Sequence, residues 1–264
     1  MNKTILAMHA HPDDVEILAA GTLAQLSSAG HYVVIASMSP GDCGSRDRPP
    51  EEIAAIRRKE AAAAARHIGA VYRCAEFRDL AIFNDDASRR RVAEVLREVR
   101  PDVVLTASPV DYMCDHEATS ALVRDACFGA PAPNYATSAV QAAPALSAVP
   151  HLYFMDPIGG VDRENRPVIA DFYVDIGGQF EAKRAMLGEH ASQREWLLAQ
   201  HGIDDYLLTM ERWTREAGRR AGVVFAEGFR QYKGHPYPLS PLLEELLGDA
   251  VRPTAQPAQD SRSK

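Results

Sequence analysis

The sequence predicts an α/β fold built on a doubly wound, mostly parallel sheet with helices on both faces. Strand and helix signals alternate through the first half of the 264-residue chain. The chain opens as strand, helix, strand, and parallel strands joined by right-handed helical crossovers build such a sheet. With 46% hydrophobic residues, the chain has enough apolar side chains for a substantial core.

The alternation is most regular before residue 110. Glycine or proline marks several boundaries: Gly30 closes the first helix, Gly69 follows the second, and the third stops before Pro101. We expect strands at 4–10, 32–39, 71–77 and 102–108, and helices at 15–30, 51–70 and 88–100.

The second half is less regular. No sharp boundary divides it, so residues 1–250 are predicted to form a single domain, and residues 251–264 a disordered tail without apolar side chains to bury. The expected elements are a helix at 118–130, a small-residue loop at 129–150, strands at 151–156 and 171–176, and two long amphipathic helices at 179–201 and 204–222.

Charge and composition argue against several classes of partner. The formal net charge is −7, and no lysine or arginine run suggests a nucleic-acid or membrane surface; "SRRRV" at 88–92 opens a helix with an apolar opposite face. The apolar stretch within the N-terminal "MNKTILAMHA" is too short for a signal peptide, and no stretch of about 18 uncharged apolar residues occurs. Four scattered cysteines form no C-x-x-C pair. We therefore expect a cytoplasmic protein.

The stretch "MHAHPDD" at residues 8–14 joins an apolar strand to an apolar helix. One interpretation is a helix start, with Pro12 at the first helical position and both aspartates at the positive end of the helix dipole. The other is a metal site, because ligand sites in parallel α/β sheets lie beyond the carboxyl ends of the strands. The two interpretations are compatible.

A second polar stretch, "PVDYMCDHEATS" at 109–120, follows a later strand and is expected to face the same crevice. A catalytic zinc takes three protein ligands and leaves one position for water. His11 and Asp14 are three residues apart across a tight turn, and His116 can supply the third ligand. Asp13 is then free to accept a proton from water.

Several motifs together resemble the PIG-L or LmbE-like family of zinc-dependent N-deacetylases. "AHPDDVEILAAGTLA" is similar to the family's signature. The resemblance continues through "SPGDCGS", "IRRKEAAAAARHIGA", "FRDL", "DYMCDHEA" and "KRAMLGEHASQ". The resemblance implies a Rossmann-like, LmbE-like fold. It also implies a hydrolase of the deacetylase class, which removes acetyl groups from N-acetylglucosamine-type substrates.

The resemblance implies roles that agree with the chemistry of the residues. His11, Asp14 and His116 would bind one zinc ion per chain, and Asp13 would be the general base that also returns a proton to the leaving nitrogen. The partner would be a small N-acyl molecule, and a homo-oligomer is plausible.

Two further residues have open interpretations. The resemblance implies that Arg57, in register with Glu60, binds substrate oxygens; without it, the spacing is typical of a surface i, i+3 pair. Asp79 in "FRDL" either binds sugar hydroxyls or makes a turn.

The sequence departs from the family at Met113. Family members commonly have H-P-D-H where this chain has "MCDH", and methionine cannot donate a proton. Either Asp13 performs both proton transfers, or His190 in "GEHASQ" is the second donor, or the substrate differs. His190 is also compatible with a packing role. Asp115 is expected to orient a site histidine, or to cap a helix.

Other functions stay open. A zinc amidase acting on a non-sugar N-acyl compound has the same catalytic needs. A weakly catalytic metal- or sugar-binding homologue would tolerate Met113, although Asp13 is intact. A nucleotide-binding protein is disfavoured because the first strand runs into HPDD instead of G-x-G-x-x-G.

Overall fold

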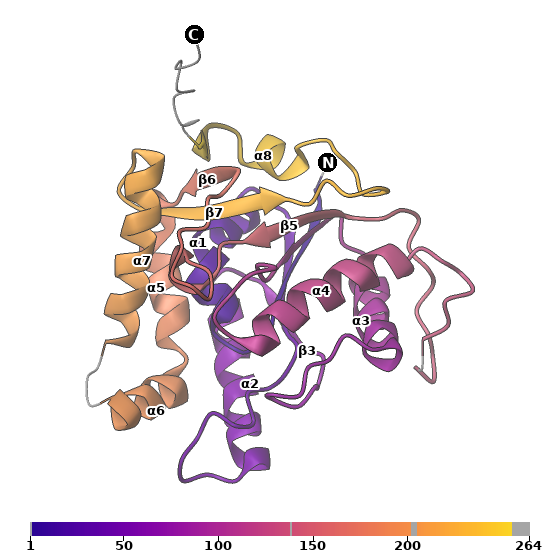
Figure 1. The fold of residues 1–264 in the computed structure, drawn as a ribbon, viewed down its shortest axis with the longest axis horizontal. Helices are drawn as coiled ribbons and strands as arrows, with labels where there is room; N and C mark the ends of the chain where they lie inside the picture. The colour runs from indigo at the N-terminus through magenta and orange to yellow at the C-terminus, as the bar shows by residue number, and fades with distance from the viewer. Residues whose placement is uncertain (1, 138, 202–204, 255–264) are drawn as a thin grey trace.

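A computed structural model describes residues 2–137, 139–201 and 205–254. Its centre is one eight-stranded sheet with the order β3-β2-β1-β4-β5-β7-β6-β8 (Figure 1). The strands are β1 (Thr4–His9), β2 (Tyr32–Ser37), β3 (Val71–Cys74), β4 (Val103–Thr106), β5 (His151–Met155), β6 (Phe172–Asp175), β7 (Ala226–Gln231) and β8 (Val251–Pro253).

The first five strands are parallel, as the sequence predicts. β1 pairs with β2 on one side and with β4 on the other, so that Ile5 lies opposite both Val33 and Val103. The helices of this half are α1 (Asp14–Ser28), α2 (Pro50–Arg66), α3 (Asp86–Val99) and α4 (Cys114–Gly129). The expected doubly wound α/β architecture is confirmed.

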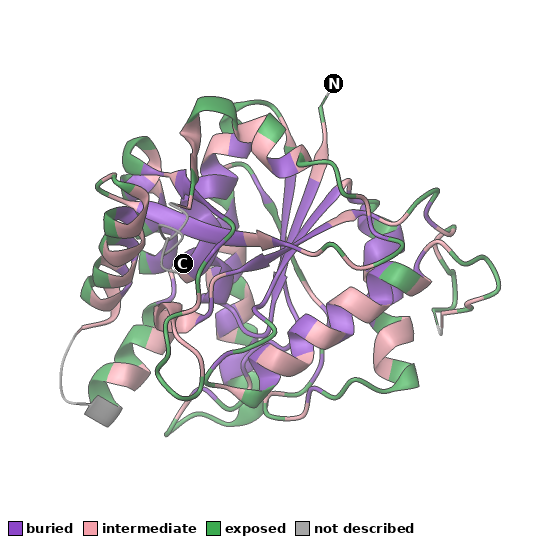
Figure 2. Cartoon of the chain, turned by 45° about the horizontal axis from the view of Figure 1, so that its top comes forward, coloured by how far each residue is buried: buried purple, intermediate pink, exposed green. Residues whose placement is uncertain are grey.

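Alternate strand residues face two separate cores, because successive side chains of a strand point to opposite faces. Ile5 and Ala7 of β1 join the core under α1, α2 and α5. Leu6 and Met8 join the core under α3 and α4. The central strands β1, β2, β4 and β5 are largely buried between these helical layers (Figure 2), whereas β3 and β8 at the sheet edges are not.

The second half differs from expectation in its strands. β7, which the sequence patterns did not predict, inserts antiparallel between β5 and β6. Residues 251–253, expected to belong to a disordered tail, form β8 and pair with β6. That part of the tail prediction is wrong because backbone pairing at a sheet edge needs little side-chain burial. Residues 255–264 lie outside the described residues.

The expected helix at 179–201 is two helices, α5 (Phe180–Gly188) and α6 (Ala191–His201). The helix is interrupted around His190. The Glu60 carboxylate caps the start of α6, because it accepts hydrogen bonds from the Ser192 amide at 2.9 Å and from the Ser192 hydroxyl at 2.6 Å. Periodicity alone could not predict this break, because the cap comes from α2.

The remaining helices complete one edge of the molecule. α7 (Tyr206–Ala221) packs on β6 and β7, and the short helices are η1 (Ile158–Gly160), η2 (Gly177–Gln179), α8 (Leu242–Leu247) and η3 (Gly248–Ala250). Among the described residues, no helix is both long and apolar enough to cross a membrane.

Candidate metal centre and cavity

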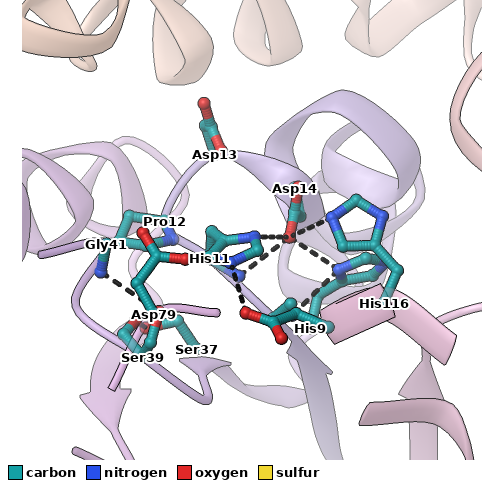
Figure 3. A network of polar contacts seen from close by, with 12 residues as sticks. His9, His11, Pro12, Asp13, Asp14, Ser37, Ser39, Gly41, Asp79 and His116 are labelled. Atoms are coloured by element: carbon teal, nitrogen blue, oxygen red, sulfur yellow. Dashed lines mark hydrogen bonds and ion pairs between the residues drawn. The ribbon is translucent and has the colours of Figure 1, made fainter. Parts of the chain in front are cut away.

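The turn between β1 and α1 separates two neighbouring carboxylates. Asp13 has a φ of 98°, a left-handed conformation that is uncommon for a residue other than glycine. Pro12 lies in this turn, and α1 begins at Asp14. The Asp14 carboxylate points into a cluster of histidines, while the Asp13 carboxylate points away from it (Figure 3). The strained turn therefore gives adjacent residues different surroundings.

One oxygen of Asp14 is the centre of the histidine cluster. Its Oδ2 lies 2.7 Å from Nδ1 of His9, 3.4 Å from Nδ1 of His11 and 3.5 Å from Nε2 of His116. All four residues are buried. Burial would raise the pKa of Asp14, but the charges of His116 and His9 and hydrogen bonds from His11 and His9 hold it well below its ordinary value. The carboxylate is thus kept ionised.

These residues fit a divalent metal. Imidazole nitrogens and a carboxylate oxygen are the ligand types that zinc takes in catalytic sites, and donor atoms of His9, Asp14 and His116 lie within 4.8 Å of one another. The expected ligands His11, Asp14 and His116 lie close together, and the structure adds His9; their binding of a metal stays a prediction. The signal for His9 was the H-x-H spacing with His11 at the carboxyl end of a buried strand.

Two further carboxylates contact the His11 ring at the nitrogen that does not face Asp14. His11 Nε2 lies 2.9 Å from Asp79 Oδ1 and 3.3 Å from Asp115 Oδ2. Burial would lower the pKa of His11, but hydrogen bonds to Asp115, Asp14 and Asp79 raise it well above its usual value. Such outer carboxylates fix the orientation of metal-binding histidines. Asp115 thus lies where it can orient a site histidine, and Asp79 shares that place.

His116 has an equivalent partner. It lies on the first turn of α4, not in the preceding loop, and its Nδ1 is 3.2 Å from Asp111 Oδ1. Asp111 is itself held by the Tyr112 and Ile158 amides. Sequence reasoning did not single out Asp111, whose relation to His116 depends on the turn that precedes α4.

Asp13 has a separate set of partners. Its Oδ2 accepts a hydrogen bond from the Tyr206 hydroxyl at 2.5 Å, and its Oδ1 lies 3.7 Å from the Arg57 guanidinium. Burial raises the pKa of Asp13, and the Arg57 charge opposes that shift. Tyr206 comes from α7 and carried no sequence signal.

Arg57 is buried and ties two loops together. Its Nη1 donates to the Gly41 carbonyl at 3.2 Å and its Nη2 to the Pro12 carbonyl at 2.9 Å. A Cβ atom at Gly41 would come within 2.1 Å of this guanidinium and displace it, and the φ of 72° at Gly41 also favours glycine. These bonds give Arg57 a loop-holding role beside the cavity, and its contact with substrate stays a prediction.

His190 is fully buried between α5 and α6. Its Nε2 lies 3.4 Å from Glu16 Oε1, and its Nδ1 has no hydrogen-bond partner within the described part of the chain. Burial would lower the pKa of His190, but the Glu16 charge raises it. His190 interacts electrostatically with Asp13 but does not line the cavity.

A cavity of about 530 Å³ opens over this cluster. Its floor includes His11, Asp13, Asp14, Asp79 and His116, and the side opposite is largely apolar. Ligand-binding cavities are commonly of this size, with a few convergent polar groups. The fold and site together define an α/β protein with a buried histidine–carboxylate centre under a large cavity.

Comparison with known proteins agrees with this class. Residues 6–127 match the PIG-L family model, described as GlcNAc-PI de-N-acetylase. The chain is thus similar to PIG-L proteins over residues 6–127, and the resemblance predicted from the motifs is confirmed.

Two proteins of similar sequence and one solved structure show what the chain resembles. The diacetylchitobiose deacetylase of Thermococcus kodakarensis is 27% identical, over 88% of this chain and 84% of that protein. The 4-oxalmesaconate hydratase of Pseudomonas putida is 26% identical, over 86% of this chain and 88% of that protein. The solved N,N'-diacetylchitobiose deacetylase from Pyrococcus horikoshii is 26% identical, with a TM-score of 0.72, and the match covers 91% of this chain and 88% of that one. The relatives are thus deacetylases and a hydratase.

Proposed function

We propose that the protein is a zinc-dependent hydrolase that cleaves the amide of an N-acylated substrate. The substrate class we propose is an N-acetylglucosamine-type sugar or sugar conjugate. The observation that carries this proposal is the division of the two aspartates: Asp14 lies among the histidines, while Asp13 faces the same cavity with other partners. Deacetylase relatives of similar length support it.

His11, Asp14 and His116 would hold the metal, because these three residues line the cavity and His9 does not. His9 would support the site through its contact with Asp14 Oδ2 at 2.7 Å. When bound, the metal supplies a Lewis acid that polarises the acyl oxygen and lowers the pKa of water. The Asp79, Asp115 and Asp111 carboxylates keep the His11 and His116 rings in place.

Asp13 would accept the proton of the attacking water and pass it to the leaving nitrogen. Its raised pKa suits a group that must both take and return a proton. Met113 lines the cavity but offers no proton, and His190 interacts electrostatically with Asp13 but does not belong to the lining. We therefore assign both transfers to Asp13 and give His190 an electrostatic influence on it.

A hydratase is the second candidate, favoured by the relative from Pseudomonas putida. Water activation beside a base would serve that reaction as well. However, Arg57 is the one lysine or arginine among the described residues that line the cavity, and both its terminal nitrogens already bond backbone carbonyls. A polyanionic substrate would therefore find little cationic support.

The deciding experiment measures amine release from N-acetylglucosamine and simple N-acyl amines, with and without a chelator. Asp13→Asn should retain zinc but lose about 10²–10⁴-fold in kcat, the usual contribution of a positioned acid–base group. An unchanged rate would remove Asp13 from the mechanism. Hydration of an unsaturated dicarboxylate without amine release would establish the second candidate.

A further inference from the structure

The wall of the cavity opposite the metal cluster is built by the two helices that close this side of the fold. α6 contributes Trp196 and Leu197, and α7 contributes Met210 and Trp213. The two helices lie beside α5 at one edge of the molecule (Figure 1). The chain contains two tryptophans, and both lie in this wall. The wall is therefore an unusual concentration of large apolar side chains next to a polar centre.

The opposite rim is apolar as well. Ile158 of η1 and Met113, directly before α4, complete the lining near His116. Met113 stands where the family's proton-donating histidine is expected, so the departure replaces a polar group with an apolar one at the cavity surface. The Trp213 indole lies close to Gly159, where an added Cβ would be 3.5 Å from the indole nitrogen.

The wall is larger than the reaction itself requires. An acetyl group has one methyl to bury, whereas the cavity measures about 530 Å³ and both tryptophans remain partly exposed within it. Exposed apolar surface gathered in a cavity indicates a ligand that covers it. Aliphatic side chains stand among the indoles, which favours an apolar group over a second sugar ring.

We propose that the substrate carries an apolar substituent, of at least aromatic-ring size, close to the scissile amide, and that the α6–α7 wall binds it. The substituent can belong to the acyl side or to the amine side, and its recognition by the wall is the same in either case. This inference rests on the proposed function for its catalytic consequence, but the binding itself needs no turnover.

The test begins with intrinsic tryptophan fluorescence, because the only two tryptophans report on the wall. Titration with phenyl N-acetylglucosaminide, N-octanoylglucosamine and plain N-acetylglucosamine should give a Kd at least about tenfold lower for the two apolar ligands, since one methylene in an apolar pocket already changes discrimination by about 10–200-fold. The first ligand tests the amine side and the second the acyl side. Equal Kd values for all three would overturn the proposal and leave a wall that binds sugar rings.

Variants then locate the effect. Trp196→Ala and Trp213→Ala should lower kcat/KM for the apolar substrates about tenfold more than for N-acetylglucosamine, mainly through KM. Leu208→Ala is the matched control, because Leu208 is an exposed α7 residue outside the cavity. An equal loss on every substrate would also overturn the proposal. Tight binding of the apolar ligands with no amine release from any compound would contradict the proposed hydrolase. It would still support an apolar binding site at the α6–α7 wall.

Discussion

The Tyr206 hydroxyl donates a 2.5 Å hydrogen bond to Asp13 across 193 residues of sequence. Tyr206 begins α7, and Asp13 is held in the strained turn before α1, so this bond connects the last long helix to the first motif of the chain. Burial and the Asp13 charge raise the pKa of Tyr206 well above its usual value, so the hydroxyl stays protonated and remains a donor.

Removing this donor should weaken catalysis without removing the metal. Tyr206→Phe keeps the ring and deletes one hydrogen bond to a charged group, which is worth about 1.5–3 kcal/mol. We expect kcat to fall roughly 10–100-fold, with little change in KM and zinc content and with an altered pH profile. Steady-state kinetics across pH and metal analysis provide the measurement. An unchanged pH profile would mean that Tyr206 only packs.

The three histidines around Asp14 should differ in their effect on metal binding. His11→Ala and His116→Ala should each abolish stoichiometric zinc. His9→Ala should leave one zinc per chain at saturation with affinity reduced about 10–100-fold, as expected for a residue that supports a ligand. Competition with a chromophoric chelator measures all three. Loss of zinc in His9→Ala but not in His11→Ala would exchange their roles.

Lys183 and Glu227 form a buried ion pair that fastens α1. Lys183 Nζ donates to Glu227 Oε1 and to the Ile17 carbonyl, both at 2.6 Å, and Glu227 accepts from the Gly21 and Thr22 amides. Lys183→Met should lower the free energy of unfolding by about 3–5 kcal/mol because it leaves the carboxylate uncompensated.

A second variant separates charge from packing at this pair. Adding Glu227→Gln to Lys183→Met removes the unpaired charge and should recover part of the lost stability. Urea denaturation of both variants measures this, and a further loss in the double variant would contradict the charge argument.

Asp156 should make stability depend on pH. Burial raises its pKa to about 6, with the Arg230 charge opposing the shift. The folded state therefore holds this proton more tightly than the unfolded state, so the contribution is fully present below pH 3.8 and is lost as pH rises through 6. Because the side chain is partly exposed, we expect a loss of about 1–2 kcal/mol between pH 4 and pH 7.

Asp156→Asn tests this dependence directly. The neutral side chain of similar shape should remove that part of the pH profile and make the variant the more stable protein at pH 7. Denaturant unfolding at several pH values compares the two profiles. Parallel profiles would show that Asp156 does not titrate in this range.

Local patterns were informative where a single segment carries the signal. The parallel first half, the position of the HPDD stretch after β1 and the pairing of His11 and Asp14 with His116 all follow from periodicity, spacing and the geometry of parallel sheets. Three features could not be predicted from local patterns: the strand β8 within the expected tail, the interruption of the helix at His190 and the insertion of β7. They depend on strand pairing and on a cap from Glu60, which involve distant segments.

The sequence by itself determined the parallel α/β frame and the chemistry offered at the end of its first strand, since both depend on short-range patterning. Only the tertiary structure decided which groups surround each aspartate. His9 contacts Asp14 because of the turn that follows β1, and Tyr206 contacts Asp13 from α7. The α6–α7 wall forms because these two helices line the same cavity. These contacts arise from packing between segments far apart in the chain, which no local pattern encodes.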